Sequence, residues 1–221
     1  MTDWPQFRAV GEAALLVELG DGTDDALNRR VLALDAALGA SPPTGFIEAV
    51  PAFASILVRF DPLATDHHQV EAHVRKIPCP SGDAELPGRS HEIAISYDRH
   101  VAPDLEAAAT ALGLAPDELV ARHLARTYRV CMCGFAPGYA YLGTLDPAIR
   151  LPRKAAIVRD VPAGTVIIAG AQCIVTTLAM PTGWWRIGHA DARLFDPEAE
   201  QPCLLMPGDQ VRFVPSRTPG P

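Results

Sequence analysis

The chain has 221 residues, of which 48% are hydrophobic and 20% charged, and its formal net charge is −7. Its length exceeds the ~100 to 150 residues typical of one domain, and its composition is too apolar for disorder, so we expect two folded domains. The 21 prolines predict many short elements joined by turns. The negative charge excludes nucleic acid as an expected partner, because phosphates require clustered Lys and Arg. No apolar run approaches the ~18 residues of a membrane span, and no targeting signal opens the sequence, so we expect no membrane association and a cytoplasmic protein.

The first third of the sequence alternates between strand and helix patterns. Apolar residues recur at helical spacing from Leu27 to Leu38, with Asp24 or Asp25 as an expected cap and Gly39 as the expected end. The expected elements are a strand over 14–19, this helix, a hairpin of strands over 46–50 and 54–60, and a second helix over 66–76. The order β-β-α-β-β-α predicts a small α/β sandwich domain over residues 1–85, with both helices on one face of a mostly antiparallel sheet.

The segment 78–88 is rich in Pro, Gly and polar residues, which is typical of a linker. Beyond it, the sequence predicts a strand over 91–97 and two short helices over 102–112 and 116–125. Pro103 and Pro116 stand at the start of these helices, where proline is favoured. Short apolar runs cut by Pro and Gly then follow, at 129–133, 166–169, 173–176, 193–195 and 211–214. This pattern is typical of a β-barrel. We therefore expect an α+β protein with a barrel domain over residues 86–221.

Several complete active sites are absent from the sequence. There is no serine between Tyr97 and Pro215, no glycine-rich phosphate loop, and no pair of histidines spaced i and i+4 around a glutamate, as a zinc-protease helix requires. The five cysteines are an odd number without a Cys-x-x-Cys pair, and we favour buried apolar packing for them over metal ligation. We predict no metal site, and we expect the chain to be one component of a larger enzyme.

Three loop segments carry residues that folding alone explains poorly. The segment 134–141 combines turn residues with three aromatic side chains, which suits either an apolar binding wall or a core-packing turn. Arg153 and Lys154 follow a proline and fit a carboxylate or phosphate, or an ordinary charged surface. Of the adjacent Trp184 and Trp185, we expect one to pack in the barrel and the other to line a site.

A set of ordered motifs lies within a match that spans about residues 90 to 215. They are Gly134–Leu142, Leu145-Asp146, Pro152-Arg153, Val161–Gly164, Ile168–Gln172, Gly183-Trp184, Ile187-Gly188, Leu194–Asp196 and Leu204–Phe213. In this order they resemble the family called allophanate hydrolase subunit 1, or the B subunit of the bacterial 5-oxoprolinase. The resemblance implies an N-terminal α/β domain followed by a cyclophilin-like β-barrel.

The resemblance also implies partners and a cofactor. Relatives act with a homologous barrel subunit, called subunit 2 or the C subunit, and a third subunit joins them to couple ATP hydrolysis to the opening of 5-oxoproline to glutamate. Related domains form half of the carboxyltransferase of urea carboxylase, and one relative inhibits a sporulation histidine kinase. Both remain alternatives here. The label of allophanate hydrolase fits less well, because a serine nucleophile is absent from the matched region.

The matched positions nominate a pocket at the mouth of the barrel. We expect its cationic and polar residues to bind a carboxylate or phosphate, and its aromatic residues to line the walls. The cationic and polar residues are Arg153, Gln172 and His189. The aromatic residues are Tyr139, Tyr141 and Trp184. The sequence departs from the family pattern at 97–100, at Met180 to Gly183 and at His189, and these departures bear on the substrate more than on the fold. No catalytic residue is assigned.

Overall fold

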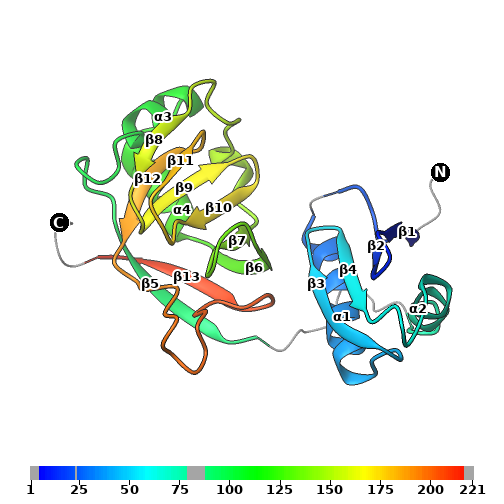
Figure 1. Cartoon of the computed structure of the whole chain (residues 1–221). Helices are drawn as coiled ribbons and strands as arrows, with labels where there is room; N and C mark the ends of the chain where they lie inside the picture. The colour runs from blue at the N-terminus through cyan, green and yellow to red at the C-terminus, as the bar shows by residue number, and fades with distance from the viewer. Residues whose placement is uncertain (1–4, 23, 79–87, 217–221) are drawn as a thin grey trace. The chain divides into compact units, whose positions relative to one another are not determined.

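A computed structural model describes residues 5–22, 24–78 and 88–216 (Figure 1). The chain divides into two compact units, Met1–Pro87 and Gly88–Pro221. Each unit has its own hydrophobic core, as independently packed domains do. The predicted linker over 78–88, with its boundary after residue 85, lies almost wholly outside the described residues.

The N-terminal unit is a four-stranded antiparallel sheet covered by two helices. The strands lie in the order β1 (Gln6–Val10), β2 (Ala14–Glu18), β4 (Ser55–Phe60) and β3 (Phe46–Pro51). The helices are α1 (Asp25–Ala40) and α2 (His67–Val74). Alternate residues of β2 and β4 pack with apolar residues of both helices in one core, so both helices lie on the same face. The predicted order β-β-α-β-β-α and the hairpin of β3 and β4 are confirmed.

The first turn of α1 forms where the sequence predicts it. The Asp24 carboxylate caps the helix by accepting a hydrogen bond of 2.8 Å from the Leu27 backbone N–H. The predicted end at Gly39 is wrong, because Gly39 does not adopt the left-handed backbone that terminates many helices. The helix instead continues through Ala40, and the Ser41 N–H donates to the carbonyl of Ala37.

The C-terminal unit is a closed seven-stranded barrel, which confirms the predicted α+β class. Around the barrel lie β10 (Gln172–Val175), β7 (Ala140–Gly143), β6 (Thr127–Cys133), β13 (Gln210–Pro215), β5 (Ser90–Ser96), β12 (Trp185–Ala190) and β9 (Thr165–Ala169). Only β5 and β13 pair in parallel among these described strands. Outside the barrel are α3 (Leu105–Leu112), α4 (Pro116–Leu124), the short helix η1 (Pro147–Ile149), and a two-stranded ribbon of β8 (Val158–Val161) and β11 (Met180–Thr182).

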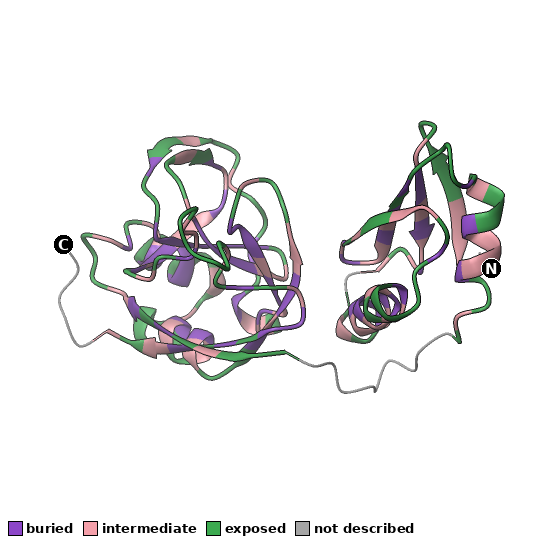
Figure 2. Cartoon of the chain, turned by 60° about the horizontal axis from the view of Figure 1, so that its bottom comes forward, coloured by how far each residue is buried: buried purple, intermediate pink, exposed green. Residues whose placement is uncertain are grey.

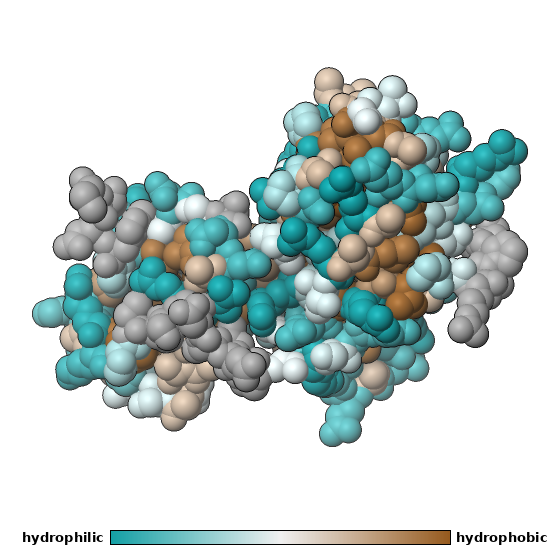
Figure 3. Space-filling model, turned by 180° about the vertical axis from the view of Figure 1, so that it is seen from behind, coloured by the Kyte–Doolittle hydropathy of each residue, from teal (hydrophilic) through white to brown (hydrophobic). Residues whose placement is uncertain are grey.

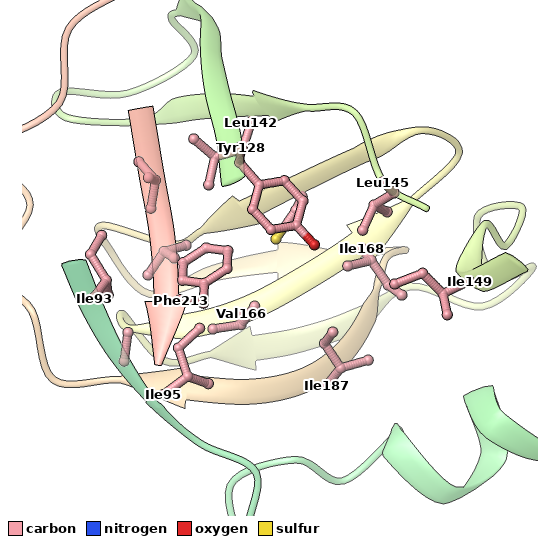
Figure 4. Packing of buried hydrophobic residues seen from close by; sticks show 14 of the residues in the cluster. Ile93, Ile95, Tyr128, Leu142, Leu145, Ile149, Val166, Ile168, Ile187 and Phe213 are labelled. Atoms are coloured by element: carbon pink, nitrogen blue, oxygen red, sulfur yellow. The ribbon is translucent and has the colours of Figure 1, made fainter. Parts of the chain in front are cut away.

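Apolar side chains fill the barrel interior. Tyr128 and Phe213 point into the same core, with isoleucines from β5, β9 and β12 around them (Figure 4). Along β9, Val166 and Ile168 belong to this core, whereas Ile167 belongs to a separate cluster on the opposite side of the strand. All five residues of β9 are buried, so both faces of this part of the barrel wall are covered (Figure 2).

Two predictions for the barrel unit need correction. The expected strand over 193–195 is not formed; Phe195 makes an isolated bridge to Cys203 instead. The first helix begins at Leu105 and not at Ala102, and its cap residue Asp104 makes no side-chain capping bond. The reason is that the Asp104 carboxylate binds Lys154 and Arg186 instead.

Candidate functional site

The predicted aromatic residues gather on the outer face of the barrel wall. Tyr139 and Trp184 pack with Ile167, Ala169 and Ile174 in a cluster separate from the barrel core. We call it the outer cluster, and Tyr141, Ala136 and Met180 pack against it. It exists because strands β7, β9 and β10 alternate, sending one set of side chains inward and the other set outward. The candidate site therefore lies on the outer wall, and the expected location at the barrel mouth is corrected.

The loop 134–139 covers this cluster with a tight turn. The Gly134 N–H donates to the Tyr139 carbonyl at 3.1 Å, and the Tyr139 N–H donates to the Ala136 carbonyl at 3.1 Å. Gly138 has a φ of 70°, and a Cβ atom there would lie 2.7 Å from the Cβ of Phe195. Only glycine fits both the left-handed backbone and this close approach. The turn thereby fixes where Tyr139 enters the outer cluster.

Three aromatic rings form a continuous series from the surface into the cluster. The ring centroids of Phe135 and Tyr139 lie 5.2 Å apart, and those of Tyr139 and Tyr141 lie 5.6 Å apart at a T-shaped angle. Tyr139 is 3% exposed, but Phe135 is 73% exposed and has a φ of 74°. An aromatic residue in left-handed backbone is uncommon, and its exposure leaves most of its apolar area uncovered. Phe135 is therefore strained and presents a large apolar surface to solvent.

Arg153 lies beside this aromatic group. Its guanidinium carbon is 5.6 Å from the centre of the Trp184 ring, within the range of a cation–π interaction. Burial raises the pKa of Tyr139 to about 12, and the nearby charge of Arg153 partly opposes that rise. Burial likewise raises the pKa of Tyr141, again opposed by Arg153. Both phenols therefore remain protonated at neutral pH, and the structure brings together Arg153, Tyr139, Tyr141 and Trp184.

Gln172 and His189, the other two predicted residues, lie on the two strands that flank β9, next to its opposite ends. Gln172 pairs with Ala169, and its side chain is on the same face as Ile174 of the outer cluster. His189 pairs with Thr165, four residues further along the same strand, or roughly 13 Å at ~3.3 Å per residue. The His189 Nε2 atom lies 3.4 Å from a carboxylate oxygen of Asp191. The structure thus places Gln172 at the edge of the outer cluster and His189 apart from Gln172.

A partly buried carboxylate that sequence reasoning did not nominate holds the site together. Asp104 accepts hydrogen bonds from Lys154 Nζ at 2.5 Å, from Arg186 Nε at 2.8 Å and from a terminal nitrogen of Arg186 at 2.9 Å. It also accepts from the Arg186 backbone N–H at 3.0 Å. The Lys154 cation is therefore paired within the chain, and Arg153 is the cation of this pair that faces the aromatic group. The only sequence signal for Asp104 was its place before a helix.

Two hydrogen bonds join the Arg153 segment to the bend between β11 and β12, where Trp184 lies. The Lys154 N–H donates to the Gly183 carbonyl at 2.7 Å, and Trp185 Nε1 donates to the Pro152 carbonyl at 2.8 Å. Trp185 also packs against the barrel core, whereas Trp184 belongs to the outer cluster. The two tryptophans thus divide between barrel packing and the candidate site.

Some kinds of site are missing from the described parts of the chain. Within residues 5–22, 24–78 and 88–216, no group of three or more His, Cys, Asp or Glu side chains lies close enough to hold a metal ion. No helix among these same residues is long and apolar enough to cross a membrane.

Sequence comparison places this geometry in a known family. The chain belongs to the carboxyltransferase domain family, subdomains C and D, whose model matches residues 5–205. The B subunit of 5-oxoprolinase from Bacillus subtilis (strain 168) is 35% identical over 97% of this chain and 94% of its own length. The B subunit of 5-oxoprolinase from Escherichia coli O157:H7 is 36% identical over 94% of both proteins. The predicted family resemblance is confirmed.

Solved structures share the fold. A crystal structure of TTHA0988 aligns with a TM-score of 0.82 at 35% identity, covering 95% of this chain, which spans 41% of that longer chain. A conserved uncharacterized protein, PH0987 from Pyrococcus horikoshii, aligns over 96% of this chain and 97% of its own with a TM-score of 0.57 and 36% identity. The urea carboxylase of Kluyveromyces lactis aligns with a TM-score of 0.76 at 18% identity, which shows a shared fold alone.

Proposed function

We propose that this chain is the B subunit of a multi-subunit 5-oxoprolinase, which opens the lactam of 5-oxoproline to glutamate with ATP hydrolysis. The observation that carries the proposal is the identity of 35% and 36% to two 5-oxoprolinase B subunits over nearly the whole chain. ATP binds through the assembled complex in this proposal, because the sequence has no glycine-rich phosphate loop. The partners are a homologous barrel protein of the C-subunit type and a third subunit.

The outer cluster supplies the groups that a small cyclic amide with one carboxylate requires. Arg153 can form a charge-assisted pair with the carboxylate, while stacking on Trp184 restricts its orientation. The phenols of Tyr139 and Tyr141 stay protonated and can donate to the lactam carbonyl, and the amide of Gln172 can donate or accept at the edge. His189 stands apart from Gln172 and, in this proposal, contacts a second anion such as a phosphate group.

The exposure of the site supports the dependence on a partner. Phe135 is 73% exposed and Arg153 is also exposed, so one side of the proposed site faces solvent in this chain, whereas Tyr139 and Trp184 are buried. Catalysis by electrostatic stabilisation needs a site from which water is excluded. A second subunit that covers Phe135 would complete such a site, and the chain would not be a complete enzyme alone.

Reconstitution tests this function. The chain is co-expressed and purified with the products of its neighbouring genes, and glutamate formation from 5-oxoproline is followed with and without ATP. We expect glutamate to form only in the complex and only with ATP. Absence of turnover in the full complex would refute the proposal, and transfer of a carboxyl group from a biotinylated partner would assign the carboxyltransferase function instead.

Substitution at Arg153 tests the site within that complex. We expect Arg153→Ala to raise KM for 5-oxoproline roughly 10- to 100-fold, the effect of losing one charge-assisted pair, with an unchanged melting temperature. Arg159→Ala, which removes another exposed arginine of the same unit, is the matched control. A large loss of melting temperature in Arg153→Ala would assign Arg153 a structural role. An unchanged KM would show that Arg153 does not bind the substrate.

A further inference from the structure

The N-terminal unit contains a cavity that the proposed function does not use. Its volume is about 360 Å³, and it lies where the end of α2 passes over β2 and the middle of α1. Val17 and Leu19 form its floor, and Leu34, Val74 and Ile77 form its walls. This volume is near the lower end of the ~300 to 1,000 Å³ typical of small-molecule sites. Hydrophobic residues reach the surface of both units (Figure 3), so the apolar lining alone does not define a ligand.

The polar side chains of the lining are all cationic. Arg30 from α1, and Arg75 and Lys76 from the end of α2, border the cavity, and no acidic residue is among the described residues that line it. Arg75 is held in place, because it donates to Glu71 at 2.9 and 2.7 Å and its guanidinium lies 4.4 Å from the centre of the Phe7 ring. Lys76 is exposed and has no ion pair within residues 5–22, 24–78 and 88–216. An apolar cavity with a cationic rim is complementary to an anion that has an apolar body.

The helix geometry distinguishes between kinds of anion. Phosphate groups are typically held by backbone N–H groups at the N-terminus of a helix. The cavity meets the opposite end of α2, because Val74 is the last helical residue and residues 75–78 continue past the cavity. The partial negative charge at a helix C-terminus acts against every anion and most strongly against a multiply charged one, so binding here depends on the Arg75 and Lys76 cations. The lining therefore favours one negative charge and a hydrocarbon body over a nucleotide.

We propose that this cavity is a binding site for a monocarboxylate with an apolar chain or ring. The hydrocarbon part would lie against Leu19, Leu34 and Ile77, and the carboxylate would lie toward Lys76 and Arg75. Lys76 contributes most to this preference for an anion, because it is exposed, whereas Arg75 already binds Glu71. No residue of the outer cluster lines this cavity, so the site is independent of the 5-oxoprolinase proposal and is suited to regulation by a carboxylate other than the substrate.

Titration of the full-length chain with sodium decanoate, below its micelle concentration, tests the proposal. We expect saturable amide chemical-shift changes at Lys76 and Ile77 in NMR spectra, with one site per chain. Decanol, which has the same chain without the charge, is expected to bind at least tenfold more weakly. Non-saturable shifts, or equal binding of decanol and decanoate, would overturn the proposal.

Two variants localise the binding. Lys76→Glu reverses an exposed charge and is expected to weaken decanoate binding at least tenfold, whereas Arg99→Glu, an equal charge change at an exposed residue of the other unit, is expected to leave it unchanged. Ile77→Trp fills the cavity from a half-buried position and is expected to abolish binding in a folded chain. Undiminished binding in either Lys76→Glu or a folded Ile77→Trp would exclude this cavity as the site.

Discussion

The Asp104 carboxylate forms a two-point ion pair with the Arg186 guanidinium, with nitrogen–oxygen distances of 2.8 and 2.9 Å. Because the same carboxylate also binds Lys154, one side chain before α3 connects β12 to the segment that carries Arg153. Asp104 is thus a positioning residue for the candidate site: it touches neither the aromatic group nor Arg153, but it fixes the residue that follows Arg153.

Replacement of Asp104 by Asn should destabilise the barrel unit by roughly 1–3 kcal/mol, because it leaves two largely buried cations without their partner. Glu118→Gln, which breaks an exposed ion pair with Arg122, should cost less than about 0.5 kcal/mol. Urea unfolding monitored by tryptophan fluorescence measures both variants. Equal costs for the two would show that the Asp104 cluster is energetically an ordinary surface pair.

The same carboxylate has a defined pH dependence. Burial acts to raise the pKa of Asp104, but hydrogen bonds from Arg186 and Lys154 outweigh it and lower the pKa from 3.8 to about 2. Its contribution to stability is therefore complete above about pH 4 and is lost as the pH falls toward 2. At neutral pH the carboxylate remains charged, so the positioning of Arg153 does not vary over the pH range of an enzyme assay.

Gly138 and Gly113 provide a matched pair for the turn that covers the outer cluster. Both have a φ of 70°, but a Cβ atom at Gly138 would lie 3.0 Å from the Leu194 carbonyl oxygen and 2.7 Å from the Phe195 Cβ, whereas one at Gly113 would meet nothing within 4 Å. We expect Gly113→Ala to cost about 1 kcal/mol, from backbone conformation alone, and Gly138→Ala to cost at least about 2 kcal/mol.

Urea unfolding of both glycine variants separates the two contributions. Gly138→Ala should also change the near-ultraviolet circular dichroism, because it displaces Tyr139 from the outer cluster. A cost for Gly138→Ala no larger than that for Gly113→Ala would mean that the loop moves away from Phe195 without penalty, and that the turn does not fix Tyr139.

Periodicity and local capping were sufficient to locate every element of the N-terminal unit except β1, for which no residue range was predicted. Helix α1 has a regular apolar stripe and a carboxylate cap at Asp24, and both features act within a few residues of sequence. Strands β7 and β12 were missed, because each mixes glycine and polar or aromatic residues whose burial depends on distant strands. A strand was predicted over 193–195 because this segment is apolar. Its apolar character instead reflects the packing of Leu194 in the barrel core, without a place in a sheet.

The candidate site was predicted in its aromatic residues but not in its supporting contacts. Ordered motifs nominated Tyr139, Tyr141, Trp184 and Arg153, which the structure places together. The contacts of Asp104 span 50 and 82 residues of sequence, and nothing local indicates such a pairing. The expected position at the barrel mouth was wrong. The strand alternation that directs these side chains outward becomes known only when the strands are paired.

A buried imidazole inside the barrel predicts a second pH effect. His123 is fully buried, with its Nδ1 atom 2.7 Å from the Tyr97 hydroxyl and its Nε2 atom 3.3 Å from the Cys173 sulfur. Burial lowers the pKa of His123 from 6.5 to about 3 and raises that of Cys173. Between pH 6.5 and about pH 3, His123 is protonated in the unfolded chain but not in the folded chain. The free energy of unfolding therefore decreases as the pH falls from 6.5 toward 3.

The His123 contribution should have a slope of about 1.4 kcal/mol per pH unit in that window. His123→Gln removes the titrating group, and the pH dependence of its unfolding free energy between pH 6.5 and 4 should be shallower by about that amount. His100→Gln, at an exposed position of the same unit, should leave the wild-type slope. If His123→Gln and wild type have parallel curves, the imidazole is protonated in the folded chain and the neutral Tyr97–His123–Cys173 arrangement is wrong.

Phe135 tests whether the strained aromatic residue serves association. In the free chain its ring contacts Tyr139 but is 73% exposed, so Phe135→Ala should change the stability of the isolated chain by less than about 1 kcal/mol. Burial of that ring by a partner would contribute roughly 1.5–3 kcal/mol, so the same variant should weaken binding to the proposed barrel partner at least tenfold. Leu63→Ala, at a residue that is 96% exposed in the N-terminal unit, is the control for loss of an exposed apolar side chain.

Titration calorimetry with the purified partner measures the affinity of both variants. An affinity unchanged in Phe135→Ala would place the interface elsewhere, and the left-handed backbone at residue 135 would then be explained only by the turn that positions Tyr139.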